Sequence, residues 1–238
     1  MKDIHSHILY GIDDGCKTFD ESVSILNKLY KEGITDLVAT PHYIIGSNYN
    51  YDNKYKNKLI KELSKKSKIN IYIGNEVFID NDIYKCIKSN KISTINNSRY
   101  LLVELPLENC CNNTQDILLK LIDEGIVPVI AHVERYEYLS IESLKEFINI
   151  GCLLQANITS LNLKYGRSPK KRLKQLLKNN MIFILGTDTH ISVLNLDLCL
   201  KKLSKLVNSD YYNNLINNNF DKLINNEDIN IGGVYEEV

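Results

Sequence analysis

Apolar runs of strand length alternate with helical patterns along the whole chain, and this alternation most constrains the fold. Each run is rich in Ile, Val or Leu, as expected of strands that are buried on both faces of a parallel sheet. The expected strands cover residues 3–9, 35–40, 69–77, 100–105, 127–132, 152–156 and 183–186.

Helical patterns fill the gaps between these runs. Two of them stop at Gly33 and Gly125, as is typical of a helix C-terminus, and another has Pro169 in its first turn. The expected helices cover residues 22–31, 53–66, 80–88, 114–124, 141–149, 169–179, 194–207 and 210–218. Seven βα units with no Pro-, Gly- or Ser-rich linker predict one domain over residues 1–238 with a parallel sheet.

Such a series folds either as a doubly wound open sheet or as a closed barrel. An open sheet gathers its site from two or three strands at one crevice, whereas a barrel gathers residues from the ends of many strands. Polar candidates follow six of the expected strands: His5, His7, His42, Glu76, Glu104, His132, Asp188 and His190. We therefore expect an irregular, distorted TIM-like (β/α)7 barrel.

All five histidines of the chain lie at these strand ends, and none is left for the surface. Residues i and i+2 of a strand point the same way, so the pairs His5/His7 and Asp188/His190 could each hold one ion. A single such pair can arise by chance, and a lone histidine elsewhere is more simply a hydrogen-bonded core residue. Glu76 also follows an apolar run, and an unpaired buried carboxylate is costly. Together the pattern predicts a metal site, because imidazole is the commonest side-chain metal ligand.

Composition excludes several classes of protein. Lys+Arg and Asp+Glu balance at 29 each, so the basic surplus of a nucleic-acid binder is missing, and the Lys-rich stretch 54–68 is interpreted as the solvated face of a helix. The N-terminus has no apolar core of a secretion signal, and no run approaches the ~18 apolar residues of a membrane span. We expect a cytoplasmic protein with no membrane insertion.

The six cysteines form no C-x-x-C pair, and none is followed six residues later by Arg. This removes the cysteine-nucleophile phosphatase loop, and we expect free thiols in a reducing compartment. The cysteines are Cys16, Cys86, Cys110, Cys111, Cys152 and Cys199.

Seven short motifs occur in an order that resembles a known family. They read DIHSHI (3–8), GIDDG (11–15), VATPH (38–42), GNE (74–76), RYLLVE (99–104), PVIAHVERY (128–136) and TDTH (187–190). The chain resembles the PHP (polymerase and histidinol phosphatase) metal-dependent phosphoesterases. More narrowly, it is similar to the bacterial tyrosine-protein phosphatases of capsule and exopolysaccharide gene clusters, the CpsB/CapC/YwqE group. The resemblance covers roughly residues 1–200 and implies a distorted (β/α)7 barrel of PHP type with three divalent ions, often manganese.

Carried over position by position, the resemblance implies nine metal ligands: His5, His7, Asp14, His42, Glu76, Glu104, His132, Asp188 and His190. It supplies Asp14 and Glu104, whereas Asp13 is interpreted as an ordinary turn residue. Mixed imidazole and carboxylate ligands suit manganese, iron or zinc better than calcium. Manganese is expected, with iron, zinc, cobalt and magnesium as alternatives.

Such a cluster implies hydrolysis of a phosphomonoester. Ions ~3.5–4 Å apart can share a bridging hydroxide that attacks the phosphorus and can clamp the leaving oxygen, with Glu76 as the candidate bridging carboxylate. A tyrosine leaving group, with a pKa of about 10, needs less protonation than an alkyl alcohol. We place Arg135, His190 and Asp14 in catalysis.

Arg135 is assigned mainly from the family pattern. Its guanidinium would hold phosphate oxygens through two parallel hydrogen bonds; the competing interpretation is a surface ion pair with Glu134 or Glu137. The chain departs from the family pattern after His190, because residues 191–195 contain no Arg. A second phosphate-side cation is therefore missing from its expected place.

The leading hypothesis is a metal-dependent protein-tyrosine phosphatase that acts on a phosphorylated bacterial tyrosine kinase controlling capsular or exopolysaccharide synthesis. The metal constellation motivates the phosphatase, whereas the kinase partner rests on the resemblance alone. One alternative is a small-molecule phosphomonoesterase such as a histidinol-phosphatase. Another is a non-catalytic module that docks on a kinase. We expect a monomer or small homo-oligomer that binds no nucleic acid.

Overall fold

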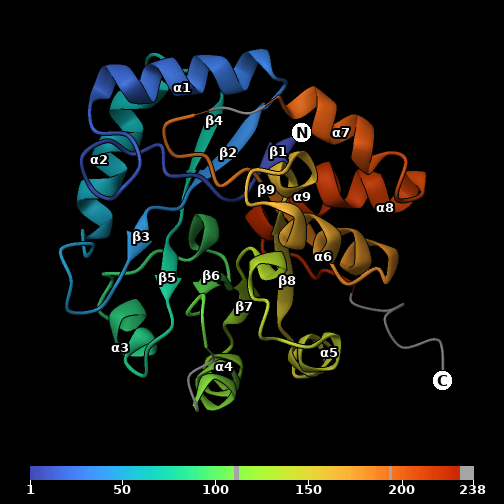
Figure 1. Ribbon diagram of the computed structural model, residues 1–238. Helices are drawn as coiled ribbons and strands as arrows, with labels where there is room; N and C mark the ends of the chain where they lie inside the picture. The colour runs from blue at the N-terminus through green and yellow to red at the C-terminus, as the bar shows by residue number, and fades with distance from the viewer. Residues whose placement is uncertain (110–112, 193–194, 231–238) are drawn as a thin grey trace.

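A curled parallel sheet forms the centre of the fold (Figure 1). The computed structural model describes residues 1–109, 113–192 and 195–230, and within them every strand pairing is parallel. The strands are β1 (Lys2–Asp3), β2 (Asp36–Ala39), β3 (His42–Tyr43), β4 (Asn70–Ile73), β5 (Glu76–Phe78), β6 (Tyr100–Glu104), β7 (Val127–Ile130), β8 (Leu153–Asn157) and β9 (Ile184–Gly186).

The strands are interrupted at two neighbouring places, one within an expected strand and one just beyond another. The third expected strand, 69–77, is divided into β4 and β5 around Gly74. The second, 35–40, corresponds to β2, and β3 is an unexpected strand that begins after Pro41. Pro41 has no N–H to donate to a ladder, and a Cβ on Gly74 would lie 2.8 Å from Cγ1 of Val38. The sheet bends at these breaks and divides into the orders β1-β2-β4 and β3-β5-β6-β7-β8-β9. The expected series of seven strand segments is otherwise retained.

Asn75, which follows Gly74, links the two interrupted segments through hydrogen bonds. Its Nδ2 donates to the carbonyl of Pro41 at 2.9 Å, and its Oδ1 accepts from the N–H of Ser93 at 3.0 Å. The same Oδ1 accepts from the ammonium of Lys56, which is fully buried. The Lys-rich stretch 54–68 is therefore not a purely solvated face, because one of its lysines points inward to the bend.

The expected first strand, 3–9, is shorter than predicted, because only Lys2–Asp3 joins a ladder. The chain beyond it pairs instead with the segment after β9. Ser6 forms an isolated bridge with Thr189. The N–H of His7 donates to the carbonyl of Thr189 at 2.8 Å, and that of Asp188 donates to the carbonyl of His5 at 2.9 Å. The two edges of the curled sheet meet here, and β1 and β9 lie together near the N-terminus in Figure 1.

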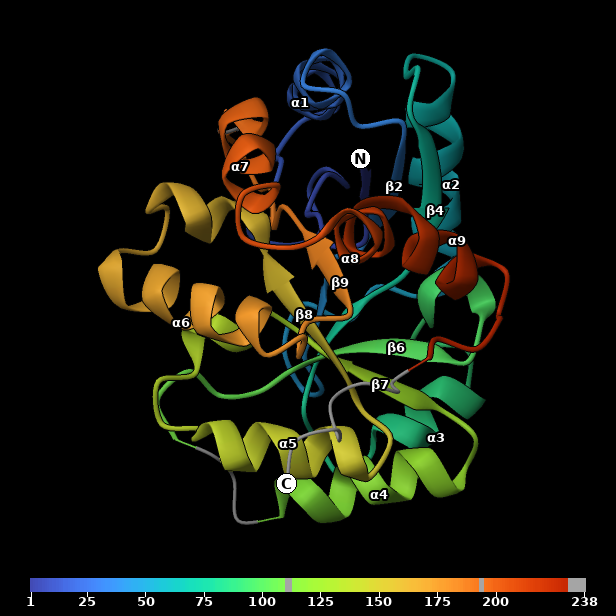
Figure 2. The same cartoon turned by 90° about the vertical axis from the view of Figure 1, so that its right-hand side faces the viewer.

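Helices surround the strands, with α1 at the top and α4 and α5 at the bottom of both views (Figures 1 and 2). Side chains of Thr18, Asp52 and Ser140 cap the N-termini of α1, α2 and α5. The expected helix 210–218 continues through a π turn, Asn214–Asn218, to Ile224. The helices are α1 (Phe19–Lys31), α2 (Asn53–Ser64), α3 (Ile83–Lys88), α4 (Thr114–Asp123), α5 (Ile141–Asn149), α6 (Arg167–Lys178), α7 (Leu196–Leu203), α8 (Ser209–Asn213) and α9 (Asn219–Ile224).

The core lies between the sheet and these helices. Leu37, Leu102, Val129, Leu154 and Ile184 are fully buried, each on a different strand, so both faces of the sheet are covered as the apolar runs predict. Among the described residues, no helix combines the length and the apolar character needed to cross a membrane.

Four cysteines are free thiols, as expected: Cys16, Cys86, Cys152 and Cys199. Cys110 and Cys111 lie outside the described residues.

Candidate metal centre

The nine residues expected to bind metal gather at the C-terminal ends of the strands. Asp14 reaches the cluster from the loop after the first strand segment, and the others follow, begin or end a strand. The ligand atoms of seven of them form three overlapping groups, and within each group the atoms lie within 4.8 Å of one another. His132 and Asp188 lie beside these groups, against Glu76 and against His5 and His7. The groups are His5, His7 and Glu76; His42, Glu76 and Glu104; and His7, Asp14, His42 and His190.

Glu76 lies at the centre of the cluster. Its Oε2 is 3.1 Å from Nε2 of His5, 3.2 Å from Nε2 of His7 and 3.2 Å from Nδ1 of His42. Its Oε1 is 3.0 Å from Nε2 of His132. Both oxygens of one buried carboxylate therefore face imidazoles, which is the geometry of a group that can bridge neighbouring cations.

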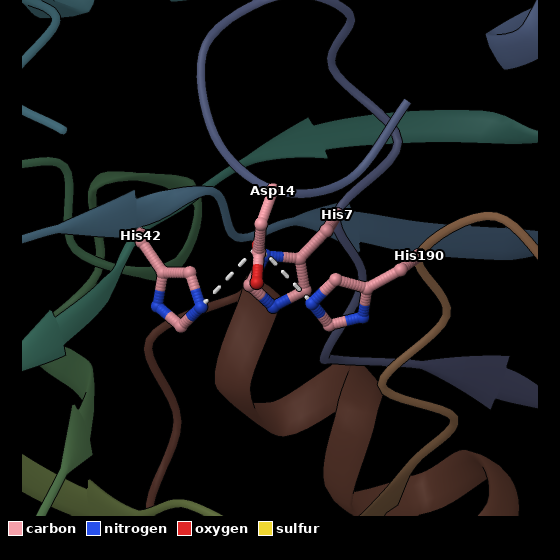
Figure 3. A group of neighbouring side chains, drawn as sticks. All are labelled: His7, Asp14, His42 and His190. Carbon is pink, nitrogen blue, oxygen red and sulfur yellow. Dashed lines mark ion pairs between the residues drawn. The ribbon is translucent and has the colours of Figure 1, made fainter. Parts of the chain in front are cut away.

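Asp14 closes the outer side of the cluster (Figure 3). Its Oδ1 lies 3.2 Å from Nε2 of His190 and 3.6 Å from Nε2 of His42. The hydrogen bond from His190 lowers the pKa of Asp14 to about 2. The rings of His7 and His190 stack with centroids 4.0 Å apart. These four side chains come from three separate parts of the chain and point toward one another.

The carboxylates give the cluster a strongly negative potential. Burial alone would raise the pKa of Glu76, but His5 and the other histidines around it hold that pKa well below its usual range. Burial lowers the pKa of His132, yet hydrogen bonds to Glu104 and Glu76 raise it to about 10. The site therefore favours positive charge, whether protons or cations supply it.

Several nitrogen atoms in the cluster lack a satisfactory partner. Within the described part of the chain, buried Nδ1 of His132 has no hydrogen-bond partner, and buried Nδ1 of His42 lies near Oε2 of Glu76 without the geometry of a hydrogen bond. Nε2 of His5 and Nε2 of His7 lie only 3.2 Å apart. Two neutral imidazoles whose lone pairs meet repel each other unless a proton or cation lies between them. The residues present thus fit divalent cations bound by mixed nitrogen and oxygen ligands.

The interpretation of Asp13 as an ordinary turn residue is wrong, because its carboxylate holds two of the expected metal ligands in place. It is buried, and its Oδ2 accepts from Nδ1 of His7 at 2.8 Å and from the N–H of His42 at 3.2 Å. Its Oδ1 accepts from the N–H of Gly15 at 2.9 Å. A carboxylate in this position fixes the tautomer and orientation of a ligating imidazole. The signal was available, since Asp13 shares the glycine-flanked loop with Asp14.

Asp188 presents its two oxygens to different surroundings. Its Oδ1 lies 3.4–3.7 Å from ring nitrogens of His5, His7 and His190. Its Oδ2 accepts hydrogen bonds from the hydroxyl of Tyr165 at 2.6 Å and from Nδ2 of Asn157 at 2.9 Å.

Sequence reasoning also missed Gln155, whose Oε1 accepts from the N–H of His132 at 2.7 Å and lies 3.4 Å from Nδ1 of His5. Gln155 and Asn157 are polar residues at i and i+2 near the end of an apolar run. That is the same pattern that identified the histidine pairs, so both could have been found.

A pocket of about 360 Å³ opens above the cluster. Glu76, Glu104 and Asp188 are among the side chains that line it, and Arg135, Lys164 and Tyr165 also line it. Ile191 and Ser192 lie at the same pocket, whereas residues 193 and 194 of the segment without Arg lie outside the described residues.

Arg135 faces this pocket. Its guanidinium lies 4.6 Å from the centroid of the Tyr165 ring, and its Nη1 is 3.7 Å from Oδ2 of Asp188. The competing interpretation as a surface ion pair is wrong for Glu134, which is fully buried and accepts hydrogen bonds from Asn157 and Ser160.

Comparison with known proteins agrees with this geometry. The CpsB/CapC family, described as capsular polysaccharide synthesis, matches residues 1–225. The putative tyrosine-protein phosphatase CapC of Staphylococcus aureus is 36% identical over 210 residues, which cover 85% of this chain and 82% of the relative. The tyrosine-protein phosphatase CpsB of Streptococcus agalactiae is 33% identical over 210 residues, covering 83% of this chain and 84% of the relative.

Solved structures confirm the expected fold. One described as YwqE from Bacillus subtilis and CpsB from Streptococcus pneumoniae, unique metal-dependent tyrosine phosphatases, matches with a TM-score of 0.89 at 24% identity. The match covers 97% of this chain and 96% of that one. A phosphotriesterase from Mycobacterium tuberculosis matches with a TM-score of 0.58 at 11% identity, over 94% of this chain and 93% of that one. The architecture is thus the TIM-like α/β barrel that the sequence predicted.

Proposed function

Because the chain belongs to the CpsB/CapC family, we propose that it is a metal-dependent protein-tyrosine phosphatase. The observation that carries this proposal is the convergence of five histidines and four carboxylates in one cluster, seven of which line a single pocket. The curated relatives named tyrosine-protein phosphatases support the choice of phosphotyrosine as the substrate.

The nine clustered residues are the proposed metal ligands. The three overlapping groups would hold three divalent ions, with Glu76 shared between two groups and His7 and His42 also shared. Divalent ions bound there would lower the pKa of a water molecule and neutralise charge on the phosphate. Manganese is the proposed metal, since the ligands mix imidazole and carboxylate; iron, zinc, cobalt and magnesium remain the alternatives.

Three residues are proposed to act on the substrate itself. Arg135 binds phosphate oxygens through its guanidinium, which Tyr165 and Asp188 hold at the pocket. Asp14 and His190 form a hydrogen-bonded pair that lines the pocket, and we assign them to the side from which the tyrosine oxygen leaves. Because the phenol of tyrosine has a pKa of about 10, its departure needs little help from an acid.

The substrate is proposed to be a bacterial tyrosine kinase that controls capsular or exopolysaccharide synthesis, and the protein is proposed to be cytoplasmic. The family description supports the link to capsule synthesis. The kinase itself is the finer part of the proposal, and mixing the protein with a phosphorylated kinase of that type would test it.

The direct test is phosphate release from a phosphotyrosine peptide by purified protein loaded with manganese. Elemental measurement of bound metal must accompany the assay. We expect release, and no release from metal-loaded protein would contradict the proposal. Faster hydrolysis of histidinol phosphate than of the peptide would instead favour a small-molecule phosphatase. Kinase binding without any hydrolysis would favour a docking module.

A further inference from the structure

We infer that Lys164 is a second cation that binds the phosphate group of the substrate alongside Arg135. This inference rests on the proposed function, because it assigns a role within the same pocket. Neither the motifs nor the expected ligands singled out Lys164.

Lys164 reaches the pocket from the connection between the 3-10 turn Ile158–Asn162 and α6. Its side chain is half-buried and lines the same pocket as the metal cluster. Its ammonium donates a hydrogen bond to the backbone carbonyl of Asp188 at 2.7 Å. The charge is therefore fixed beside a proposed metal ligand.

Tyr165 holds two cations at once. The ammonium of Lys164 lies 4.9 Å from the centroid of its ring, and the guanidinium of Arg135 lies 4.6 Å from the same centroid. The hydroxyl of Tyr165 donates to Oδ2 of Asp188 at 2.6 Å, which fixes the ring. Cation–aromatic contacts of this kind position a charge without neutralising it.

The charge on Lys164 is not neutralised by its hydrogen bond. The hydrogen bond that its ammonium donates goes to the backbone carbonyl of Asp188, which takes up only one of its three donors and none of its charge. Lys164 and Arg135 both line the pocket, so a doubly charged anion bound there would be attracted to two positive charges. A phosphate monoester is such an anion.

This position accounts for the departure from the family pattern. The segment after His190 has no Arg, so it offers no second cation. Lys164 supplies a positive charge to the same pocket from a different part of the chain. A lysine acts as a compact charge on a flexible stem, so it can meet a phosphate oxygen without the fixed fork of an arginine.

A purely structural role is the competing explanation. Asp188 has a positive φ of 50°, and Lys164 could serve only to hold its carbonyl. The two roles differ in what they affect, since a structural role changes metal binding and a phosphate-binding role changes anion affinity.

The experiment compares manganese-loaded wild type with K164M, K164R and K174M. Lys174 is exposed on α6, so K174M removes an equal charge away from the pocket. Bound metal is measured by elemental analysis, and the affinity for inorganic phosphate is measured by calorimetry. We expect K164M to retain its metal and to bind phosphate about 10–100-fold more weakly, as for loss of a charge-assisted hydrogen bond. K164R should recover most of the affinity, and K174M should match wild type.

Two outcomes would overturn the inference: unchanged phosphate affinity in K164M, or loss of metal in K164M that accounts for its weaker binding. With phosphotyrosine peptide, KM should rise in K164M more than kcat falls. Phosphate affinity needs no turnover, so the proposed function is tested separately. A wild type that binds phosphate through Lys164 but hydrolyses no phosphotyrosine peptide would contradict the proposed function alone.

Discussion

The carboxylate of Asp188 links the histidine cluster to Tyr165, which lines the pocket, and to Asn157. One oxygen faces the histidines, and the other faces Tyr165 and Asn157. Its backbone adopts a left-handed conformation that is uncommon for a residue other than glycine. Strain of this kind persists only where surrounding contacts impose it.

Replacement of central ligands should remove the metal and with it the activity. We expect D188A and H5A each to abolish turnover, because both side chains lie in the innermost part of the cluster. Elemental analysis should show reduced metal content in both. The exposed Asp20 provides a control, D20N, which should behave as wild type. Retained activity in both ligand variants would refute the site assignment.

Asp13 should affect metal affinity without binding metal. D13N keeps the size of the side chain but loses the charge that orients His7. We expect metal affinity to fall by about 10–100-fold, as is usual for such outer partners of a ligand. Titration with a competing chelator would measure this. Equal affinities of D13N and wild type would show that the carboxylate has no orienting role.

The sequence predicted the ligand-type residues better than their supports. The former occupy short motifs at strand ends. The structure groups seven of them within reach of a shared ion, and it places His132 beside Glu76 and Asp188 beside His5 and His7. Supports such as Gln155 contact His5 across 150 positions of the chain. Such contacts depend on which strands lie side by side in the fold. A single sequence motif does not show which strands will be neighbours.

At the level of elements, close approach between β9 and the first strand segment depends on Gly186. A Cβ at this position would lie 2.6 Å from Cβ of His5 and 2.9 Å from Nε2 of Gln155. Both neighbours are fully buried, so neither can move away easily.

G186A should therefore destabilise the fold and disturb the site. We expect the free energy of unfolding to fall by about 1–3 kcal/mol, as for other overpacked interiors, together with weaker metal binding. Urea denaturation of the metal-free protein separates the first effect from the second. K174M, on the exposed face of α6, is the control. An unchanged unfolding midpoint would mean that β9 can shift without cost.

The breaks between β2 and β3 and between β4 and β5 were not predicted. The expected strand 69–77 runs through the second break, and β3 lies beyond the expected strand 35–40, so the apolar pattern indicated neither the bend nor the extra strand. Only Pro41 and Gly74 marked the positions, and their effect depends on alignment between neighbouring strands: Ala39 pairs with Ile73, and His42 with Glu76.

Across the whole molecule, bound metal should stabilise the fold. The proposed ligands come from both ends of the chain, and any ion that binds only the folded state stabilises it by mass action. Chelation should lower the unfolding free energy, by about 2.7 kcal/mol where free metal had been at 100 times its Kd. Thermal unfolding with and without chelator would measure the change, and H5A should show much less. Equal stabilities for wild type would contradict ion binding at this site.

Lys56 should make stability depend on pH. Burial lowers the pKa of Lys56 from 10.5 to about 7. Between these values the unfolded chain binds a proton that the folded chain does not, so raising the pH through this range stabilises the fold. The difference in unfolding free energy between wild type and K56M should shift in favour of wild type by up to about 1.4 kcal/mol per pH unit. Urea denaturation from pH 7 to pH 9 provides the test, and parallel curves for the two proteins would contradict it.

The bridge between Ser6 and Thr189 also has a consequence for biosynthesis. Synthesis proceeds from the N-terminal side, so His5 and His7 are made long before their neighbours Asp188 and His190, which come after β9. A nascent or prematurely terminated chain that stops before β9 contains seven of the nine proposed ligands and lacks Asp188 and His190. The proposed metal site can therefore form only after the segment that follows β9 has been synthesised.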